Sequence, residues 1–219
     1  MIADQASREG GAHVSRSRAA RWRIVCLISL VVFLGLGFAA YATGALPGDL
    51  FLLRELAVKD PGLASELARW VSYGGRAQVL VPGTIVLFLL SPVARRRWWL
   101  WCAVLIGAPL LQNVLKFLVG RSRPDGSSLG FPSGHATAAA AFAVVLIYVA
   151  SRERLGRGSR WAVAALAVFL MLAVGWARIM RSAHWPSDVL GAFVLGTCCA
   201  AAAAWWETSL SEAGALDTS

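Results

Sequence analysis

The sequence predicts an all-α integral membrane protein with six transmembrane helices, and three observations lead to this prediction. Of the 219 residues, 58% are hydrophobic, and the mean hydropathy is +0.62; a soluble domain of this length is less apolar. The apolar residues fall in long blocks without helical alternation, which is typical of membrane spans. The formal net charge of +9 comes largely from arginines at the ends of these blocks. This placement follows the positive-inside rule, so we expect a lipid bilayer and not a nucleic acid as the partner.

The chain divides into three expected regions. Residues 1–20 are polar and rich in Ser, Arg and Gly, which predicts a disordered cytoplasmic tail. Residues 21–207 hold the six-helix membrane domain, and residues 208–219 form a short cytoplasmic tail. Between the first two spans, residues 43–76 carry Leu and Trp at roughly helical spacing. We expect short amphipathic helices at the membrane surface there, with an ordinary packed loop or a lid over the site as the alternatives.

The six spans are expected at about 24–42, 77–94, 98–119, 135–150, 161–179 and 187–206. Ala40-Tyr41-Ala42 imitates a signal-peptide cleavage site, but the first run is long for a signal core, which favours an uncleaved helix. Six spans put both termini on one side, together with the arginine-rich segments 8–23, 95–97 and 152–160. This side is therefore predicted to be cytoplasmic, with loops 120–134 and 180–186 on the other side.

A polar stretch, Phe131–His135, precedes the apolar run of the fourth span. Ser133 is a good helix N-cap, so Gly134 and His135 are expected to begin a helix. The free N–H groups and the positive dipole end of a helix N-terminus attract an anion. Gly134 lets the backbone approach that anion, and His135 is placed to give it a proton.

Two further clusters favour the same ligand chemistry. Lys116 and Arg123 are seven positions apart, close to two helical turns, so both cations are expected on one face of a helix that ends at Pro124. Downstream, Arg178 is followed by His184 and Asp188, and a carboxylate beside a histidine fixes its tautomer and stabilises its charged form. Three cations, two histidines, one carboxylate and a helix start suit a phosphate better than a neutral substrate.

The chain here resembles a known family, the type 2 phosphatidic acid phosphatases, whose superfamily also includes glucose-6-phosphatase and the vanadium haloperoxidases. The resemblance rests on three patterns: Lys116-x6-Arg123-Pro124, Pro132-Ser133-Gly134-His135 and Arg178-x5-His184-x3-Asp188. The third motif of the family usually opens with Ser-Arg, whereas Ala177 precedes Arg178 here, which removes one hydroxyl contact. The motifs cover residues 116–188, about a third of the chain, and their number and order make the signal specific.

The resemblance implies a metal-independent phosphatase that works through a phosphohistidine. His184 would attack phosphorus, Asp188 would orient His184, and His135 would protonate the leaving oxygen. The phosphate oxygens would be held by Lys116, Arg123, Ser133, Gly134 and Arg178. Further contacts, to the headgroup or to these residues, are expected from Arg121, Asp125 and Arg181. We expect neither a metal nor a cofactor, because Lys and Arg supply the positive charge and the sequence has no carboxylate cluster for magnesium.

The expected substrate is a lipid phosphate or diphosphate, hydrolysed at the outer face of a bacterial cytoplasmic membrane. Undecaprenyl diphosphate, phosphatidylglycerol phosphate and phosphatidic acid are all candidates at this stage. One alternative is a vanadate-dependent haloperoxidase-like enzyme, against which the membrane spans argue. The other is a non-catalytic protein that binds or transports lipid phosphates, against which the intact His184 and Asp188 argue. The sequence leaves the oligomeric state open.

Overall fold

The computed structural model of this protein describes the backbone of residues 2–58 and 62–216, and the side chains of residues 18–58 and 62–213. Residues 1, 59–61 and 217–219 lie outside the described residues, and with them parts of the two predicted tails and of the segment 43–76. The described chain folds into helices with the following bounds: α1 (Ile2–Thr43), α2 (Asp49–Leu56), α3 (Leu63–Tyr73), α4 (Ala77–Leu90), α5 (Pro92–Arg96), α6 (Trp98–Val119), α7 (Gly134–Arg152), α8 (Arg157–Met180) and α9 (Pro186–Leu216).

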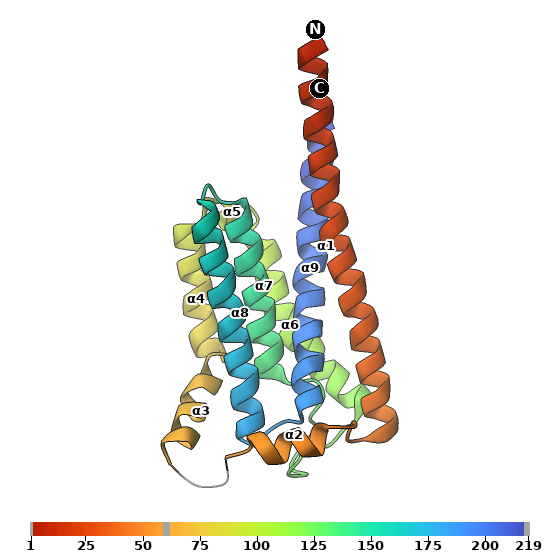
Figure 1. The fold of residues 1–219 in the computed structure, drawn as a ribbon, viewed down its shortest axis with the longest axis vertical. Coiled ribbons are helices and arrows are strands. Elements are labelled where there is room, and N and C mark those ends of the chain that lie inside the picture. Colours follow the sequence, from red (N-terminus) through yellow and green to blue (C-terminus); the bar gives the residue numbers. More distant parts are fainter. Residues whose placement is uncertain (1, 59–61, 217–219) are drawn as a thin grey trace.

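The long helices form one bundle whose two ends differ (Figure 1). Helices α1 and α9 run side by side and form the most extensive helix pair, while α7 packs between α8 and α9. Both termini lie at one end, on the same side as α5 and the α7–α8 connection. The short helices α2 and α3 lie at the opposite end, where the α6–α7 and α8–α9 connections also lie.

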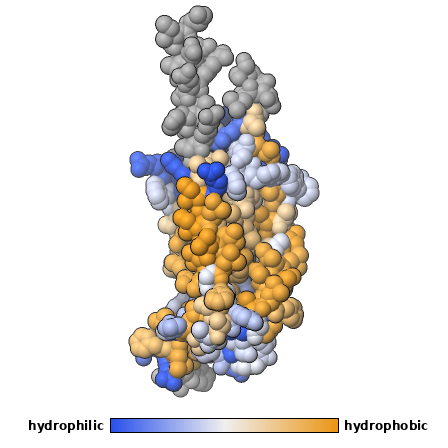
Figure 2. All heavy atoms as spheres, turned by 90° about the vertical axis from the view of Figure 1, so that its right-hand side faces the viewer, coloured by the Kyte–Doolittle hydropathy of each residue, from blue (hydrophilic) through white to orange (hydrophobic). Residues whose placement is uncertain are grey.

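The outer surface of the bundle is apolar. Figure 2 shows a broad hydrophobic belt on the face that it draws, with polar residues toward both ends. Many large apolar side chains are exposed, among them Phe38 (73%), Leu90 (78%) and Phe117 (79%). Soluble proteins do not expose so much apolar surface, whereas a bilayer solvates it. The all-α membrane fold is thus confirmed, and the protein is a multi-pass membrane protein.

Five helices of the described chain are long and apolar enough to cross a membrane: Arg18–Thr43, Trp98–Val119, Gly134–Arg152, Arg157–Met180 and Pro186–Ala213. A sixth span results only if α3 and α4, which meet at a bend of 49°, are counted as one broken span. The second span was expected to run without a break over 77–94, and this was wrong. The Ser91 side chain instead accepts a hydrogen bond from Ala94 N (3.0 Å), and Pro92, which has no N–H, starts α5. The count of six stays a prediction.

The N-terminal region also differs from expectation. Helix α1 begins at Ile2, so the residues 2–20 that the sequence predicts to be disordered continue the helix of the first span. Once an apolar span has formed a helix, each added residue needs no new nucleation. The Ala, Arg, Glu and Gln residues of this stretch are good helix formers, which is the physical basis for the extension.

Small residues bring α7 and α9 close together at the end that carries the sequence motifs. A Cβ atom at Gly196 would lie 2.5 Å from the Thr137 carbonyl oxygen, and one at Gly191 would lie 2.4 Å from the Phe131 ring. Such contacts leave no room for a larger side chain. The Phe131 ring also stacks on Phe33 of α1, with 5.7 Å between the ring centroids. The segment before α7 is therefore packed between α1 and α9.

Candidate active site

A buried histidine–carboxylate pair lies at the start of α9. His184 Nδ1 is 3.3 Å from Asp188 Oδ2, and their side chains are only 1% and 0% exposed. The Trp185 amide also donates to Asp188 Oδ2, at 3.0 Å. The carboxylate therefore accepts from Nδ1–H, which leaves Nε2 as the imidazole nitrogen with a free lone pair. This geometry suits a nucleophile held in one tautomer.

A tight turn after α8 brings His184 next to Arg178. Ser182 has φ 50°, in the left-handed region, and its N–H donates to the Ile179 carbonyl at 2.8 Å. The next amide, that of Ala183, donates to the Arg178 carbonyl at 3.1 Å. The chain thus turns back immediately at the end of α8, so that the cation on α8 and the histidine of the turn are neighbours.

Three cations surround His184 and influence its protonation. Burial lowers the pKa of His184 well below its ordinary value of 6.5, and the positive charges of Arg178, Lys116 and Arg123 lower it further. A hydrogen bond to the Gly130 backbone acts in the opposite direction. All three cations that the sequence assigned to phosphate binding are therefore near enough to act on the imidazole, which is neutral at pH 7.

Arg123 lies in a loop, and not on the helix where the sequence predicts it. Helix α6 ends at Val119, because Gly120 takes φ 67° and caps it, four residues before Pro124. Arg123 instead lies in a narrow loop, where Ser122 and Leu129 form an antiparallel bridge and Arg123 Nε donates to the Leu129 carbonyl at 3.3 Å. The expectation that Lys116 and Arg123 share one helix face was wrong, although both lie near His184.

The start of α7 contributes groups with unused hydrogen-bonding capacity. Helix α7 begins at Gly134, as expected, with Ser133 in the N-cap position. The Ser133 hydroxyl makes no capping bond, however, and is buried without a described partner. Its amide donates to the Asp188 carbonyl at 3.1 Å, which ties α7 to α9. A buried hydroxyl without a partner is costly, so this oxygen is available to a ligand.

Arg178 is held in place by α3. Its guanidinium Nη1 donates to the Ser72 hydroxyl at 3.0 Å, and the residue is 8% exposed. Its Nε is buried without a described partner. One side of the guanidinium is therefore anchored, and the other has a donor free for an anion.

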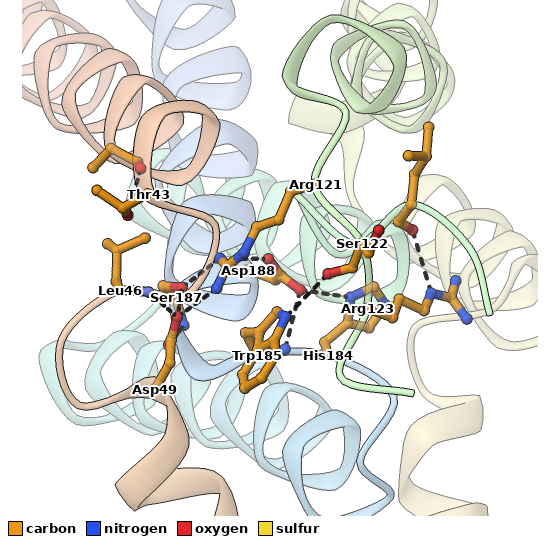
Figure 3. A network of polar contacts seen from close by, with 12 residues as sticks. Thr43, Leu46, Asp49, Arg121, Ser122, Arg123, His184, Trp185, Ser187 and Asp188 are labelled. Carbon is orange, nitrogen blue, oxygen red and sulfur yellow. Dashed lines mark hydrogen bonds and ion pairs between the residues drawn. The ribbon is translucent and has the colours of Figure 1, made fainter. Parts of the chain in front are cut away.

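A second buried network contacts Oδ1 of Asp188, the carboxylate oxygen that does not face His184 (Figure 3). The Arg121 guanidinium lies between two carboxylates: Nη1 donates to Asp188 Oδ1 at 2.9 Å, and Nη2 pairs with Asp49 Oδ2. Ser187 joins them, because its amide and hydroxyl both donate to Asp49, at 2.9 and 2.6 Å. Arg121 was expected as an auxiliary contact, and the structure places it in this buried network rather than toward a headgroup.

The other two auxiliary candidates lie away from this network. Asp125 is in an exposed turn, where its carboxylate accepts from the Ser127 amide at 3.0 Å and from the Ser127 hydroxyl at 2.8 Å. These bonds lower the pKa of Asp125 and account for its position as a turn residue. Arg181 is exposed at the end of α8. Asp125 therefore forms no hydrogen bond or ion pair with another candidate site residue among the described residues.

Several residues of α2, α3 and their linkers that no sequence motif marks also contact the site. Asp49 and Ser72 have no motif around them, and their site contacts are separated from them by more than 70 positions in the chain. Arg76, which precedes α4, has its Nε 3.4 Å from His135 Nε2. The sequence around Asp49 predicts only local structure. Pro47-Gly48-Asp49 indicates a turn and a helix start, but not which residues the Asp49 carboxylate contacts.

A cavity of about 960 Å³ opens beside these groups. Its polar end is lined by Arg76, Lys116, Arg123, His135 and His184. Its remaining wall comes mainly from apolar side chains of α4 and α6, which include Leu80, Ile85, Phe88, Leu105 and Ile106. Within the described residues, no group of three or more His, Cys, Asp or Glu side chains could hold a metal ion.

These observations define a class of protein: a helical membrane protein with a cationic, histidine-containing site at one end of its bundle. The family model of the PAP2 superfamily matches residues 97–211, which is more than half of the chain, so the protein belongs to this superfamily. No curated protein matches the sequence.

Two solved structures are similar in fold. One is the first transmembrane PAP2-type phosphatidylglycerolphosphate phosphatase from Bacillus subtilis, with a TM-score of 0.72 and 23% identity over 83% of this chain and 95% of that one. The other is LpxE from Aquifex aeolicus, with a TM-score of 0.51 and 24% identity over 70% of this chain and 93% of that one. At these identities the likeness establishes the fold.

The Arg121 network leads to a prediction about stability. Asp49→Asn keeps the volume of the side chain but removes the charge that faces a buried guanidinium. Breaking a buried ion pair costs about 3–5 kcal/mol, so the melting temperature in detergent should fall by on the order of 10 °C. Asp125→Asn, the same change in an exposed turn, is the control and should leave the melting temperature within about 1–2 °C. Equal melting temperatures for the two variants would contradict a structural role for Asp49.

Proposed function

We propose that this protein is a membrane lipid phosphatase that hydrolyses a phosphomonoester or diphosphate of a lipid through a phosphohistidine on His184, without a metal. The observation that carries the proposal is the convergence of Lys116, Arg123 and Arg178 on a neutral, buried His184. These three cations form no ion pair with a carboxylate of the described residues, so their charge can stabilise a phosphoryl group and the charge that develops on it.

The cavity supports a lipid substrate. From Cys102 to Lys116, α6 rises about 21 Å, at 1.5 Å per residue, so the cavity wall reaches from the cationic end well into the apolar part of the bundle. A phosphate at Lys116 would leave the lipid tail along α4 and α6, where Leu and Ile side chains replace contacts with other lipids. A water-soluble phosphate ester would use none of this surface.

The first chemical step follows from the geometry of the histidine–carboxylate pair. His184 Nε2 attacks phosphorus, the N–P bond forms, and the bond from phosphorus to the leaving oxygen breaks. Asp188 holds Nδ1–H and stabilises the positive charge that the imidazole acquires. Lys116, Arg123, Arg178, the Ser133 hydroxyl and the Gly134 N–H hold the phosphoryl oxygens. His135, at the cavity wall, protonates the leaving oxygen when that oxygen needs a proton.

The second step regenerates the enzyme. A water molecule gives a proton to His135 and attacks phosphorus from the side that the lipid has left. The N–P bond breaks, its electron pair returns to His184 Nε2, and inorganic phosphate is released. Both steps use the same cations, because both transition states place negative charge on the same phosphoryl oxygens.

The comparisons support the reaction class but leave the lipid open. The Bacillus subtilis protein with the similar fold is described as a phosphatidylglycerolphosphate phosphatase, and this chain has the motif residues expected for such chemistry. Phosphatidylglycerol phosphate, undecaprenyl diphosphate and phosphatidic acid are the substrates to test. The arginine-rich ends of α1, α5, α7 and α8 support a cytoplasmic location for the opposite end of the bundle, and hence an outward-facing site in a bacterial cytoplasmic membrane.

Phosphate release from these three lipids in detergent micelles tests the proposed function. The wild-type protein should release phosphate from at least one of them in the presence of a strong chelator, and vanadate should inhibit it. His184→Ala removes the attacking nitrogen and should abolish release from every lipid, whereas the exposed Asp125→Asn should retain full activity. If the wild-type protein releases no phosphate, or requires magnesium for release, the proposal is wrong.

The pH profile tests the electrostatics of His184. Attack requires the neutral imidazole, and the pKa of His184 lies below 6.5, so kcat/KM should stay high as the pH falls to 6.5 and decline only below it. Arg178→Gln removes one of the charges that lower this pKa, so the acid limb of its residual activity should move to higher pH. Arg54→Gln, a change in an exposed arginine of α2, should not move it. If the acid limb of Arg178→Gln lay at the same pH as that of the wild-type protein, the assignment of this limb to His184 would be wrong.

Membrane sidedness can be tested by labelling single cysteines in intact cells. A cysteine introduced at Ser127, in the exposed turn of the α6–α7 connection, should react with an impermeant thiol reagent. A cysteine introduced at Gly156, in the α7–α8 connection, should react only after the membrane is permeabilised. The reverse pattern would place the site on the cytoplasmic side.

A further inference from the structure

Arg76 is a third cation that lines the cavity, beside Lys116 and Arg123, and the proposed chemistry leaves it without a role. The three motif cations act on His184, and Arg76 is in direct contact with the other histidine: its Nε is 3.4 Å from His135 Nε2. Its guanidinium carbon lies 4.1 Å from the centroid of the Tyr73 ring, a cation–π contact that holds the side chain beside the cavity. No carboxylate of the described residues forms an ion pair with it.

The backbone shows that this position is built into the fold. Gly75 packs directly on the first turn of α7, where a Cβ atom would lie 2.5 Å from the His135 carbonyl oxygen and 2.8 Å from the His135 Cβ. Only glycine permits this approach. The linker between α3 and α4 is therefore in contact with His135, and the next residue along the chain, Arg76, is brought to the same side of the cavity as the proposed acid.

The charge of Arg76 therefore lies where the leaving group departs. In the proposed reaction His184 attacks phosphorus on one side and His135 meets the leaving oxygen on the other. A leaving alkoxide needs the proton of His135 and gains little from a second cation after protonation. A leaving phosphate becomes a dianion as the bond breaks, and its second pKa of about 6 lets it depart without a proton. A fixed guanidinium stabilises that charge as it develops.

We propose that Arg76 binds a phosphate group bonded directly to the leaving oxygen, and that it makes the site selective for lipid diphosphates. This inference rests on the proposed phosphatase function. His184 Nε2 bonds to the terminal phosphorus, the bond from that phosphorus to the bridging oxygen breaks, and the bridging oxygen keeps the electron pair as part of the lipid monophosphate. Arg76 pairs with that lipid monophosphate. Water then releases inorganic phosphate from His184 as in the general reaction, and the proton that His135 takes from this water passes to solvent.

The test compares kcat/KM for three lipids in matched micelles: undecaprenyl diphosphate, phosphatidylglycerol phosphate and phosphatidic acid. Arg76→Ala should lower the value for the diphosphate by about 10–100-fold, the usual effect of deleting one charged hydrogen bond. The value for phosphatidic acid, which has no second phosphate, should change by less than about threefold. The value for phosphatidylglycerol phosphate should change as little, because three carbons separate its second phosphate from the phosphate that is hydrolysed. Arg76→Lys should recover part of the diphosphate activity, and Arg54→Ala should change none of the three values.

Retained hydrolysis of phosphatidic acid shows that the Arg76→Ala protein is folded. A second measurement needs no turnover: methylenediphosphonate should inhibit the wild-type protein more strongly than methylphosphonate does, and Arg76→Lys should reduce this preference. Equal losses on all three lipids, or an unchanged preference between the two phosphonates, would overturn the role of Arg76. A wild-type protein that releases phosphate from none of the lipids would instead overturn the proposed function itself.

Discussion

The buried guanidinium of Arg121 is the interaction on which the rest of the site depends. It joins three segments that are far apart in the chain, since Asp49 starts α2, Arg121 follows α6, and Asp188 lies in the first turn of α9. A single buried charge of this kind would be very costly, but two carboxylates neutralise it, and the Ser187 hydroxyl accepts a further hydrogen bond from Nη1. Because Asp188 is fixed by Arg121 on one oxygen, its other oxygen is fixed on His184.

The arginines and the lysine of the site differ in whether a carboxylate forms an ion pair with them. Arg121 forms ion pairs with Asp49 and Asp188, whereas Lys116, Arg123 and Arg178 act on His184 and form no ion pair with a carboxylate of the described residues. In the proposed reaction, Lys116, Arg123 and Arg178 keep the His184 imidazole neutral before it attacks phosphorus, so that the lone pair on Nε2 is available. The phosphoryl oxygens would offset these cations after attack, and Asp188 would stabilise the positive imidazole. The same charges would thus favour the reactive form of the histidine before attack and the phosphorylated form after it.

The sequence was a good guide wherever the signal is local. The third span was expected at residues 98–119, which are the bounds of α6, and α7 begins at Gly134 as its turn and apolar run predict. Lys116, Arg178, His184 and Asp188, which the resemblance marks as site residues, lie close together at helix ends, and their catalytic roles stay predictions. A local signal also led to an error: Pro124 was expected to end α6, but Gly120 ends this helix earlier.

The contacts that could not be predicted join segments with no shared pattern. Asp49 meets Ser187 across 138 positions, Ser72 meets Arg178 across 106, and Arg76 meets His135 across 59. All three come from the segment between α1 and α4, whose composition resembles that of any amphipathic surface loop. A one-dimensional pattern shows that a helix has a polar face, but not which buried group that face will meet. Their roles follow only from the tertiary packing of α2 and α3 on α8 and α9.

The segment 43–76 was interpreted as amphipathic surface helices, as a packed loop or as a lid over the site, and these contacts argue against a lid. A lid must leave the site and return to it, but moving α2 away would separate Asp49 from four donors, on Leu46, Arg121 and Ser187, and would leave Arg121 with one carboxylate. Moving α3 would remove the hydroxyl that anchors Arg178. Each buried group left without a partner costs about 1–3 kcal/mol, and a charged one costs more, so the sum is comparable to the stability of a whole domain. The described part of this segment therefore acts as a brace that holds Arg121 and Arg178 in position. Since the cavity is lined by α4 and α6 and not by α2, the proposed lipid substrate would reach Lys116 and Arg123 from the bilayer while the brace stays closed.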